Sequence, residues 1–166
     1  IDKTPFYSEI NYKDGKQEGS TKVYYEDGSL WSEGNFKNDK KEGLRKEYYE
    51  DGTLSSVENY KDGKQEGLWK EYNKDGTLLS VENFKDGEID GLSQSWYKNG
   101  QLRFEGTYKD GKSNGLFRWW ESNGILSMEL TYKDNKLEGL WRDYNRDGTY
   151  EYVNYFYIDE IILEEE

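Results

Sequence analysis

The chain has 166 residues, of which 33% are hydrophobic and 35% charged, and its mean hydropathy is −1.21. Aromatic residues make up 17% of it, a content that argues against disorder because disordered segments are poor in aromatics. The net charge of −12 disfavours nucleic acid and anionic membranes as partners, since both attract basic surfaces. The chain has no cysteine, which excludes a disulfide framework, and no apolar run approaches the roughly 20 residues of a membrane-spanning helix.

Residues 1–11 contain the one proline, Pro5, and are predicted to form an N-terminal cap, an incomplete repeat that acts as an edge strand. Proline near a sheet edge discourages edge-to-edge pairing. The first residue is Ile1 and not Met, which is compatible with removal of a signal peptide.

Residues 12–154 consist of six copies of a 24-residue repeat without insertions. Such self-similarity at a fixed period is the signature of a repeat architecture, in which each unit packs on its neighbours. Two glycines recur at this period: one at Gly19, Gly43, Gly67, Gly91, Gly115 and Gly139, the other at Gly28, Gly52, Gly76, Gly100, Gly124 and Gly148.

Each repeat carries two turn signals, exemplified by Glu50-Asp51-Gly52 and Lys61-Asp62-Gly63. Asp-Gly and Asn-Gly between short apolar-containing runs are strong signals for β-hairpins. We therefore predict an all-β fold, an elongated single-layer antiparallel meander of about six to seven β-hairpin repeats of 24 residues, with residues 1–166 forming a single domain.

The parity of side chains along a strand favours one turn type. A three-residue loop at Glu50-Asp51-Gly52 with a glycine bulge would pair Tyr48 with Leu54, whereas a two-residue loop would place the two on opposite faces. The first option predicts a single apolar face that carries Leu44, Tyr48, Leu54, Tyr60, Leu68 and their counterparts in the other repeats, and we expect these columns to form the core.

The opposite face varies between repeats, and free positions of this kind can hold residues specific for a partner. One column reads Thr21, Arg45, Trp69, Ser93, Phe117 and Trp141. Exposed aromatics are common anchors of interfaces, although a second hydrophobic layer under Lys and Arg stems would explain them equally well. The candidate partner-binding residues are Trp31, Trp69, Tyr97, Phe117, Trp119 and Trp141.

Residues 150–166 drop the turn pattern and are predicted to form a C-terminal closing strand followed by the acidic tail Glu164-Glu165-Glu166. Charge at an exposed edge limits aggregation.

The sequence offers no catalytic, cofactor-binding or metal-binding set. It lacks His and Cys and has no phosphate-binding glycine loop, so we predict that the protein is not an enzyme and uses no cofactor. The recurring aspartates sit at turn positions, which explains them structurally and leaves calcium binding by turn acids open. Glycines such as Gly67 are read as sites where a backbone or large side chain approaches closely, or alternatively a ligand.

The core Tyr60-Lys61-Asp62-Gly63-Lys64-x-x-Gly67, with its Tyr-x-x-Gly turn, resembles the MORN repeat in its bacterial variant form. The resemblance covers nearly the whole chain and implies a curved sheet of successive hairpins. It also implies a binding scaffold with lipid or protein partners, and the bacterial variant is commonly labelled an antitoxin. Asp39 and Asn135 replace the turn glycine in two copies. Asn and Asp tolerate positive φ better than other residues, so we expect the turn to survive there.

These observations predict a non-enzymatic protein-binding repeat scaffold, with antitoxin-like or immunity-like masking of a basic protein partner. The alternative is a secreted carbohydrate-binding, cell-wall-binding or adhesive surface module, since exposed Trp and Tyr can stack on sugar rings. A secreted or periplasmic location is favoured over a cytoplasmic one, and the oligomeric state stays open.

Overall fold

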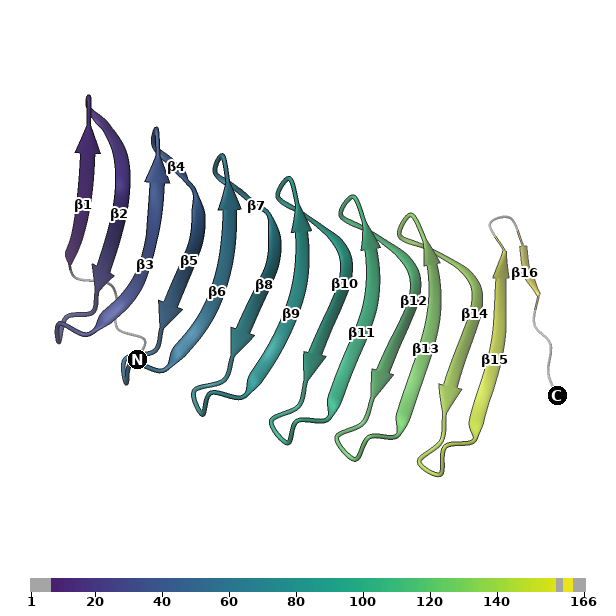
Figure 1. Ribbon diagram of the computed structural model, residues 1–166. Helices are drawn as coiled ribbons and strands as arrows, with labels where there is room; N and C mark the ends of the chain where they lie inside the picture. Colours follow the sequence, from purple (N-terminus) through teal and green to yellow (C-terminus); the bar gives the residue numbers. More distant parts are fainter. Residues whose placement is uncertain (1–6, 158–159, 163–166) are drawn as a thin grey trace. The chain divides into compact units, whose positions relative to one another are not determined.

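The computed structural model describes residues 7–157 and 160–162, and all elements of this part are β-strands joined by short turns (Figure 1). It contains no helix long and apolar enough to span a membrane. The chain divides into two compact units. Unit 1 comprises Ile1–Leu78 and Phe84–Gly87, and unit 2 comprises Leu79–Asn83 and Glu88–Glu166.

The strands of unit 1 alternate with tight turns. They are β1 (Tyr7–Lys13), β2 (Lys16–Tyr24), β3 (Leu30–Lys37), β4 (Lys40–Lys41), β5 (Gly43–Tyr48), β6 (Leu54–Lys61), β7 (Lys64–Gln65) and β8 (Gly67–Tyr72). Strand β9 (Leu78–Lys85) contributes residues to both units.

The other strands of unit 2 continue the pattern. They are β10 (Glu88–Trp96), β11 (Leu102–Lys109), β12 (Lys112–Trp120), β13 (Leu126–Lys133), β14 (Lys136–Tyr144), β15 (Tyr150–Tyr157) and β16 (Glu160–Ile162). The predicted closing strand is therefore a pair, β15 with β16, in antiparallel register. Pro5 of the predicted cap and Glu164–Glu166 of the predicted acidic tail lie outside the described residues.

Strand order follows sequence order along a main path of 14 strands, with β4 paired to β3 and β7 paired to β6 beside it. Consecutive strands pair antiparallel, as in β1 with β2 and β12 with β13. The predicted all-β antiparallel meander of hairpin repeats is confirmed.

The predicted three-residue loop is also confirmed. The N–H of Tyr49 donates to the carbonyl of Thr53 at 2.8 Å, and the N–H of Gly52 donates to the carbonyl of Tyr49 at 2.8 Å. Gly52 has φ 81°, as a glycine bulge requires. Tyr48 pairs with Leu54, as the parity argument predicted.

Two-residue turns close the other end of each hairpin, and Asp62 has φ 52° in one of them. In the two copies that lack the turn glycine, Asp39 and Asn135 adopt φ 65° and 67°, which confirms that the turn survives. Each side chain there also accepts a hydrogen bond at 2.7 Å from a backbone N–H one repeat earlier, Asp39 from Gln17 and Asn135 from Ser113.

The predicted single apolar face is wrong, because a second bulge lies between Glu47 and Tyr48. Beyond this bulge Leu44 pairs with Asn59, whereas Tyr60 pairs with Gly43. Directly opposed residues point to the same side of a sheet and neighbours along a strand point to opposite sides. Tyr60 therefore lies on the face opposite to Leu44 and Tyr48.

We name the two faces of each unit by their residues. The leucine face carries Leu44 and Leu68 in unit 1 and Leu92 in unit 2, and these side chains are 57%, 52% and 45% exposed, so this column is not the predicted core. The aromatic face holds Phe36, Tyr60, Trp69 and, in ring contact with Trp69, Phe84 in unit 1, and Phe104, Tyr108, Phe117, Trp119 and Tyr132 in unit 2. The buried hydrophobic residues of the strands, Phe84, Phe117 and Leu130, belong to the aromatic face.

The recurring Glu-Gly step links successive repeats. Its carboxylate accepts the backbone N–H of the following two-residue turn, with Glu42 bonded to Asp62 at 2.9 Å and Glu66 to Asp86 at 3.0 Å. Gly43 at this step has φ 74°, and a Cβ built on it would meet no atom within 4 Å. Backbone conformation, and not the close approach expected from the sequence, therefore requires glycine at this position.

We expect Gly43→Ala to lower the free energy of unfolding by about 1–2 kcal/mol, because an alanine in the left-handed region is strained although space is available. Gly43→Asn should cost less, since asparagine tolerates positive φ. Urea unfolding of the two variants and the wild type measures both effects. Equal stability of Gly43→Ala and wild type would contradict the assigned cause.

Tyr48 on the leucine face is bound to an acid of the neighbouring strand. Its hydroxyl donates to Oε1 of Glu33 at 2.8 Å, and Nζ of Lys46 lies 3.8 Å from the same oxygen. Burial, and then the hydrogen bond to Glu33, raise the pKa of Tyr48 to about 12.

Because this pKa is raised above the ordinary value of about 10, the stabilisation that Tyr48 provides is fully present below about pH 10 and is lost as pH rises through about 12. We therefore expect the stability difference between the wild type and Tyr48→Phe to shrink over this window. Urea unfolding of both proteins at several pH values measures this difference. Other titrating groups are common to the two proteins, so their contributions cancel in the difference. A constant difference between pH 10 and 12 would rule out this linkage.

Candidate functional site on the aromatic face

The register places four of the six candidate partner-binding residues on the aromatic face. Trp69 of β8 lies there in unit 1, and Phe117, Trp119 and Trp141 lie there in unit 2. Trp31, at the start of β3, lines a cavity on the aromatic face of unit 1.

Tyr97 stands apart from the other five, in the turn after β10. Its hydroxyl donates to the carbonyl of Trp120 at 2.8 Å. Tyr25 and Tyr49 occupy the same place in unit 1 and bond the carbonyls of Tyr48 and Tyr72. This tyrosine links one turn to the next repeat, which is a structural reason for its presence.

Phe117 is the centre of the aromatic cluster in unit 2 and is only 3% exposed. Its ring centroid lies 5.0 Å from that of Tyr132, 5.2 Å from Tyr108, 5.9 Å from Phe104 and 6.1 Å from Trp119. Phe117 is therefore packed inside the face and presents almost no surface of its own. Trp119 and Trp141 are half-buried and keep part of their rings accessible.

Gly106 makes room for this ring. It pairs directly with Phe117 across β11 and β12, and a Cβ built on Gly106 would lie 2.5 Å from Cε1 of Phe117 and 2.8 Å from Cζ of Phe104. Leu130 pairs with Phe117 on the other side, in β13. The unit 2 face is thus filled by one ring lying between a glycine and a leucine.

Three repeats earlier, in unit 1, two of these three positions hold different residues and the glycine is kept. Arg45 takes the place of Phe117, Gly34 that of Gly106, and Glu58 that of Leu130. The aliphatic stem of Arg45 lies over Gly34, where a Cβ would meet its Cγ at 3.3 Å. An ion pair therefore occupies the centre of the unit 1 face.

Glu58 is buried and is held by three donors. Tyr60 donates its hydroxyl proton to Oε2 at 2.6 Å, and Nη1 of Arg45 and Oγ of Ser56 each lie 3.4 Å from Oε1. Nη1 of Arg45 also pairs with the carboxylate of Glu47. Burial, and then the bond to Glu58, raise the pKa of Tyr60.

Lys41 completes this network. Its Nζ donates to the hydroxyl of Tyr60 at 3.3 Å and lies 4.5 Å from the centroid of that ring. Burial, with the neighbouring charge of Arg45, lowers the pKa of Lys41. The ammonium is therefore partly removed from water and has a neutral hydroxyl as its hydrogen-bond partner.

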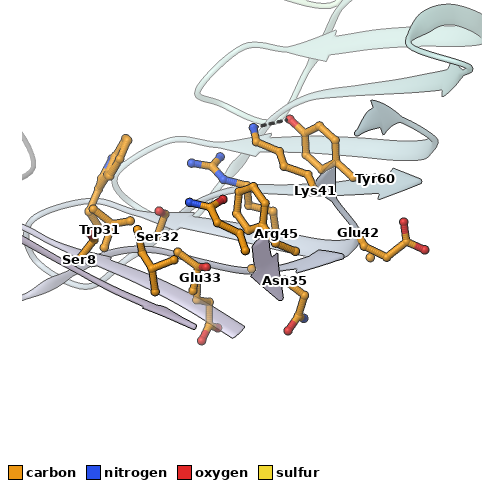
Figure 2. A pocket seen from close by; sticks show the side chains of 16 residues that line it. Ser8, Trp31, Ser32, Glu33, Asn35, Lys41, Glu42, Arg45 and Tyr60 are labelled. Atoms are coloured by element: carbon orange, nitrogen blue, oxygen red, sulfur yellow. Dashed lines mark hydrogen bonds between the residues drawn. The ribbon is translucent and has the colours of Figure 1, made fainter. Parts of the chain in front are cut away.

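A cavity of about 310 Å³ opens beside this network within unit 1 (Figure 2). In Figure 2 the side chains of Trp31, Lys41, Arg45 and Tyr60 lie on one side of the sheet, and those of Glu33 and Asn35 on the other. The apolar part of the cavity lining comes from Ile10, Val23, Trp31, Phe36, the ring of Tyr60 and Gly34.

The aromatic face offers binding groups rather than an activated nucleophile. Within the described ranges, no group of three or more acidic, His or Cys residues is arranged to hold a metal ion. The loop aspartates serve the backbone, as where Oδ1 of Asp51 accepts the N–H of Thr53 at 3.0 Å and Oδ1 of Asp27 that of Ser29 at 2.9 Å.

Four residues of the unit 1 network, Lys41, Arg45, Glu58 and Tyr60, were not selected from the sequence. Arg45 is the one charged residue at its position among the six repeats, and this departure was the available signal, whereas Glu58 recurs one repeat later as Glu82. Recognising them as a pair required the register across β5 and β6.

We expect Gly106→Ala to destabilise the protein by about 1–3 kcal/mol, because the added methyl group overlaps the rings of Phe117 and Phe104. The double variant Gly106→Ala/Phe117→Leu should recover part of the loss, since leucine vacates that space. Thermal unfolding of the two single variants and the double variant measures the coupling. Strictly additive losses would contradict the proposed overlap.

A comparison with protein-family models matches the description "MORN repeat variant" at residues 17–38, 41–62, 65–86, 89–110 and 113–134. These five segments cover more than half of the chain and coincide with hairpin repeats of the structure. No curated protein matches the chain in sequence. The chain belongs to the MORN repeat variant family.

Proposed function

We propose that the protein is a non-enzymatic protein-binding module that takes a basic partner on its aromatic face. The observation that carries the proposal is the incomplete burial of this face. No side chain of the described residues falls below 2% relative exposure, and Trp69, Trp119 and Trp141 stay half-buried. Large aromatic side chains left partly open on a sheet are typical anchors of interfaces.

The charge of the chain supports a basic partner. With 35 acidic against 23 basic residues the protein attracts cationic surfaces, and complementary charge raises association rates. In the proposed role the module masks a basic protein in the manner of an antitoxin or immunity protein. Such masking needs a surface and no chemistry, which agrees with the binding groups of the aromatic face.

Trp119 and Trp120 provide a matched test within unit 2, because these neighbours in β12 point to opposite faces. We expect Trp119→Ala to weaken partner binding by about tenfold or more, as loss of an interface anchor does, and Trp120→Ala to change it less than about threefold. The partner is first captured from cells of the organism of origin with the wild-type chain. Its affinity for the three proteins is then measured by calorimetry.

Trp69 and Leu68 repeat this test in unit 1, since they are adjacent in β8 and lie on opposite faces. Thermal unfolding of each variant separates lost binding from lost folding. A captured partner that is acidic, or one that depends on Trp120 and Leu68 instead, would overturn the proposal. Capture of glycans in place of protein would also overturn it, in favour of a carbohydrate-binding module.

A further inference from the structure

We infer that the cavity beside Arg45 in unit 1 is a binding site for a small organic carboxylate with an apolar body, such as an aromatic acid. This inference goes beyond the proposed protein-binding function and depends on Lys41 and Arg45, which that proposal does not use. An experiment can therefore overturn the carboxylate site without overturning the protein-binding function, and the reverse.

The charged side chains directed toward the cavity are cations. Lys41 and Arg45 lie on the cavity side of the sheet in Figure 2, together with Trp31. The two acids of the lining are engaged elsewhere: Glu33 accepts the hydroxyl of Tyr48 at 2.8 Å, and Glu42 accepts the N–H of Asp62 at 2.9 Å. An anionic group entering the cavity meets donors and no facing carboxylate of the lining.

Both cations keep unused donors. Arg45 uses Nη1 for Glu47 and Glu58, so Nε and Nη2 make no hydrogen bond or ion pair within the described part of the chain, and the guanidinium carbon lies 5.8 Å from the ring centroid of Trp31. Lys41 has one hydrogen bond, to the hydroxyl of Tyr60, and an ammonium has three donors. The guanidinium is held in place by two carboxylates that do not line the cavity, and a fixed guanidinium suits bidentate binding of a carboxylate.

The rest of the lining requires an apolar body. Ile10, Val23, Phe36 and Trp31 surround a volume of about 310 Å³, which lies in the range of small-molecule pockets. A bare inorganic anion would leave this apolar surface in contact with water. An aromatic or branched aliphatic acid covers it while its carboxylate reaches the cations.

Unit 2 shows why the cavity exists in unit 1. At the equivalent positions Phe117 and Leu130 fill the face, and Phe117 is almost fully buried against Gly106. In unit 1 the glycine is kept as Gly34, while the ring is replaced by Arg45, whose stem lies over Gly34 and leaves a cavity that both residues line.

The test is calorimetric titration of the full chain with 3-phenylpropionate and with its neutral amide. We expect the acid to bind at least about tenfold more tightly than the amide, because only the acid gains the charge-assisted hydrogen bonds. Equal affinities would overturn the inference, and so would absence of binding by the acid.

Lys41→Gln tests the ammonium with little risk to the fold, since Gln17 and Gln65 stand at this position in neighbouring repeats. Lys40→Gln is its matched control, an exposed neighbour that does not line the cavity. We expect Lys41→Gln to weaken acid binding by about tenfold and Lys40→Gln to leave it unchanged. Equal effects of the two variants would contradict the site.

The double variant Arg45→Phe/Glu58→Leu copies the packing of unit 2 and should close the cavity. Replacing an ion pair by apolar residues of suitable volume is often neutral or stabilising, so we expect retained thermal stability with loss of acid binding. Undiminished binding by this stable variant would overturn the inference. If it unfolds, Lys41→Gln still decides.

The carboxylate can belong to a free acid or to the C-terminus of a protein, and a further pair of ligands distinguishes these sources. The pair is a tripeptide that ends in a phenylalanine with a free carboxylate and the same peptide as its amide. Preference for the free-acid peptide over 3-phenylpropionate supports a site for a protein C-terminus, and the reverse order supports a site for a free acid. Binding of the peptide amide as strongly as the peptide acid would overturn the carboxylate specificity.

Discussion

A β-bulge in each hairpin, beside the aromatic residue that ends its first strand, decides which side chains lie on which face of the sheet. It lies between Glu47 and Tyr48 in unit 1, and between Ser95 and Trp96 and between Trp119 and Trp120 in unit 2. One extra residue in a strand reverses the facing of every residue beyond it. The Tyr60 column is thereby moved to the aromatic face, away from the leucines, where it packs with the variable residues of each repeat.

Chain-wide regularity comes from contacts that each repeat makes with the next. In the repeats that carry a tyrosine before the three-residue turn, its hydroxyl bonds a carbonyl one repeat later, as Tyr49 does with Tyr72 at 2.6 Å. Carboxylates of the Glu-Gly step bond the N–H groups of the two-residue turns. These bonds involve backbone groups and recurring side chains, so they leave the centre of the aromatic face free to change.

The two units use this freedom in different ways. Unit 2 places a ring between Gly106 and Leu130 and gains a packed apolar centre. Unit 1 places Arg45 opposite Glu58 and retains a cavity with two cations and a tryptophan. One repeat after this pair, Trp69 replaces Arg45 while the glutamate is kept as Glu82, so the two positions change independently along the chain.

The sequence by itself determined the repeat period, the turn types and the chemistry of each column, because glycine, aspartate and asparagine encode local backbone conformation. Asp39 and Asn135 at positive φ, and the glycine bulge at Gly52, follow from local preferences of this kind. The sequence also placed Trp69, Phe117, Trp119 and Trp141 on one common face, as the register has them, since positions spaced by two or by a whole repeat keep their relative facing.

Only the tertiary structure decided which columns share a face and which of them are buried. Glu47 pairs with Ser56 and Tyr48 with Leu54, so the extra residue of the bulge is Ser55, a residue type with no strong bulge signature. A shift of one residue is enough to reverse facing because side chains alternate with a period of two. Burial of Phe117 and exposure of Leu44 follow from that shift. The pairing of Arg45 with Glu58 over Gly34 likewise exists only once three strands are in register.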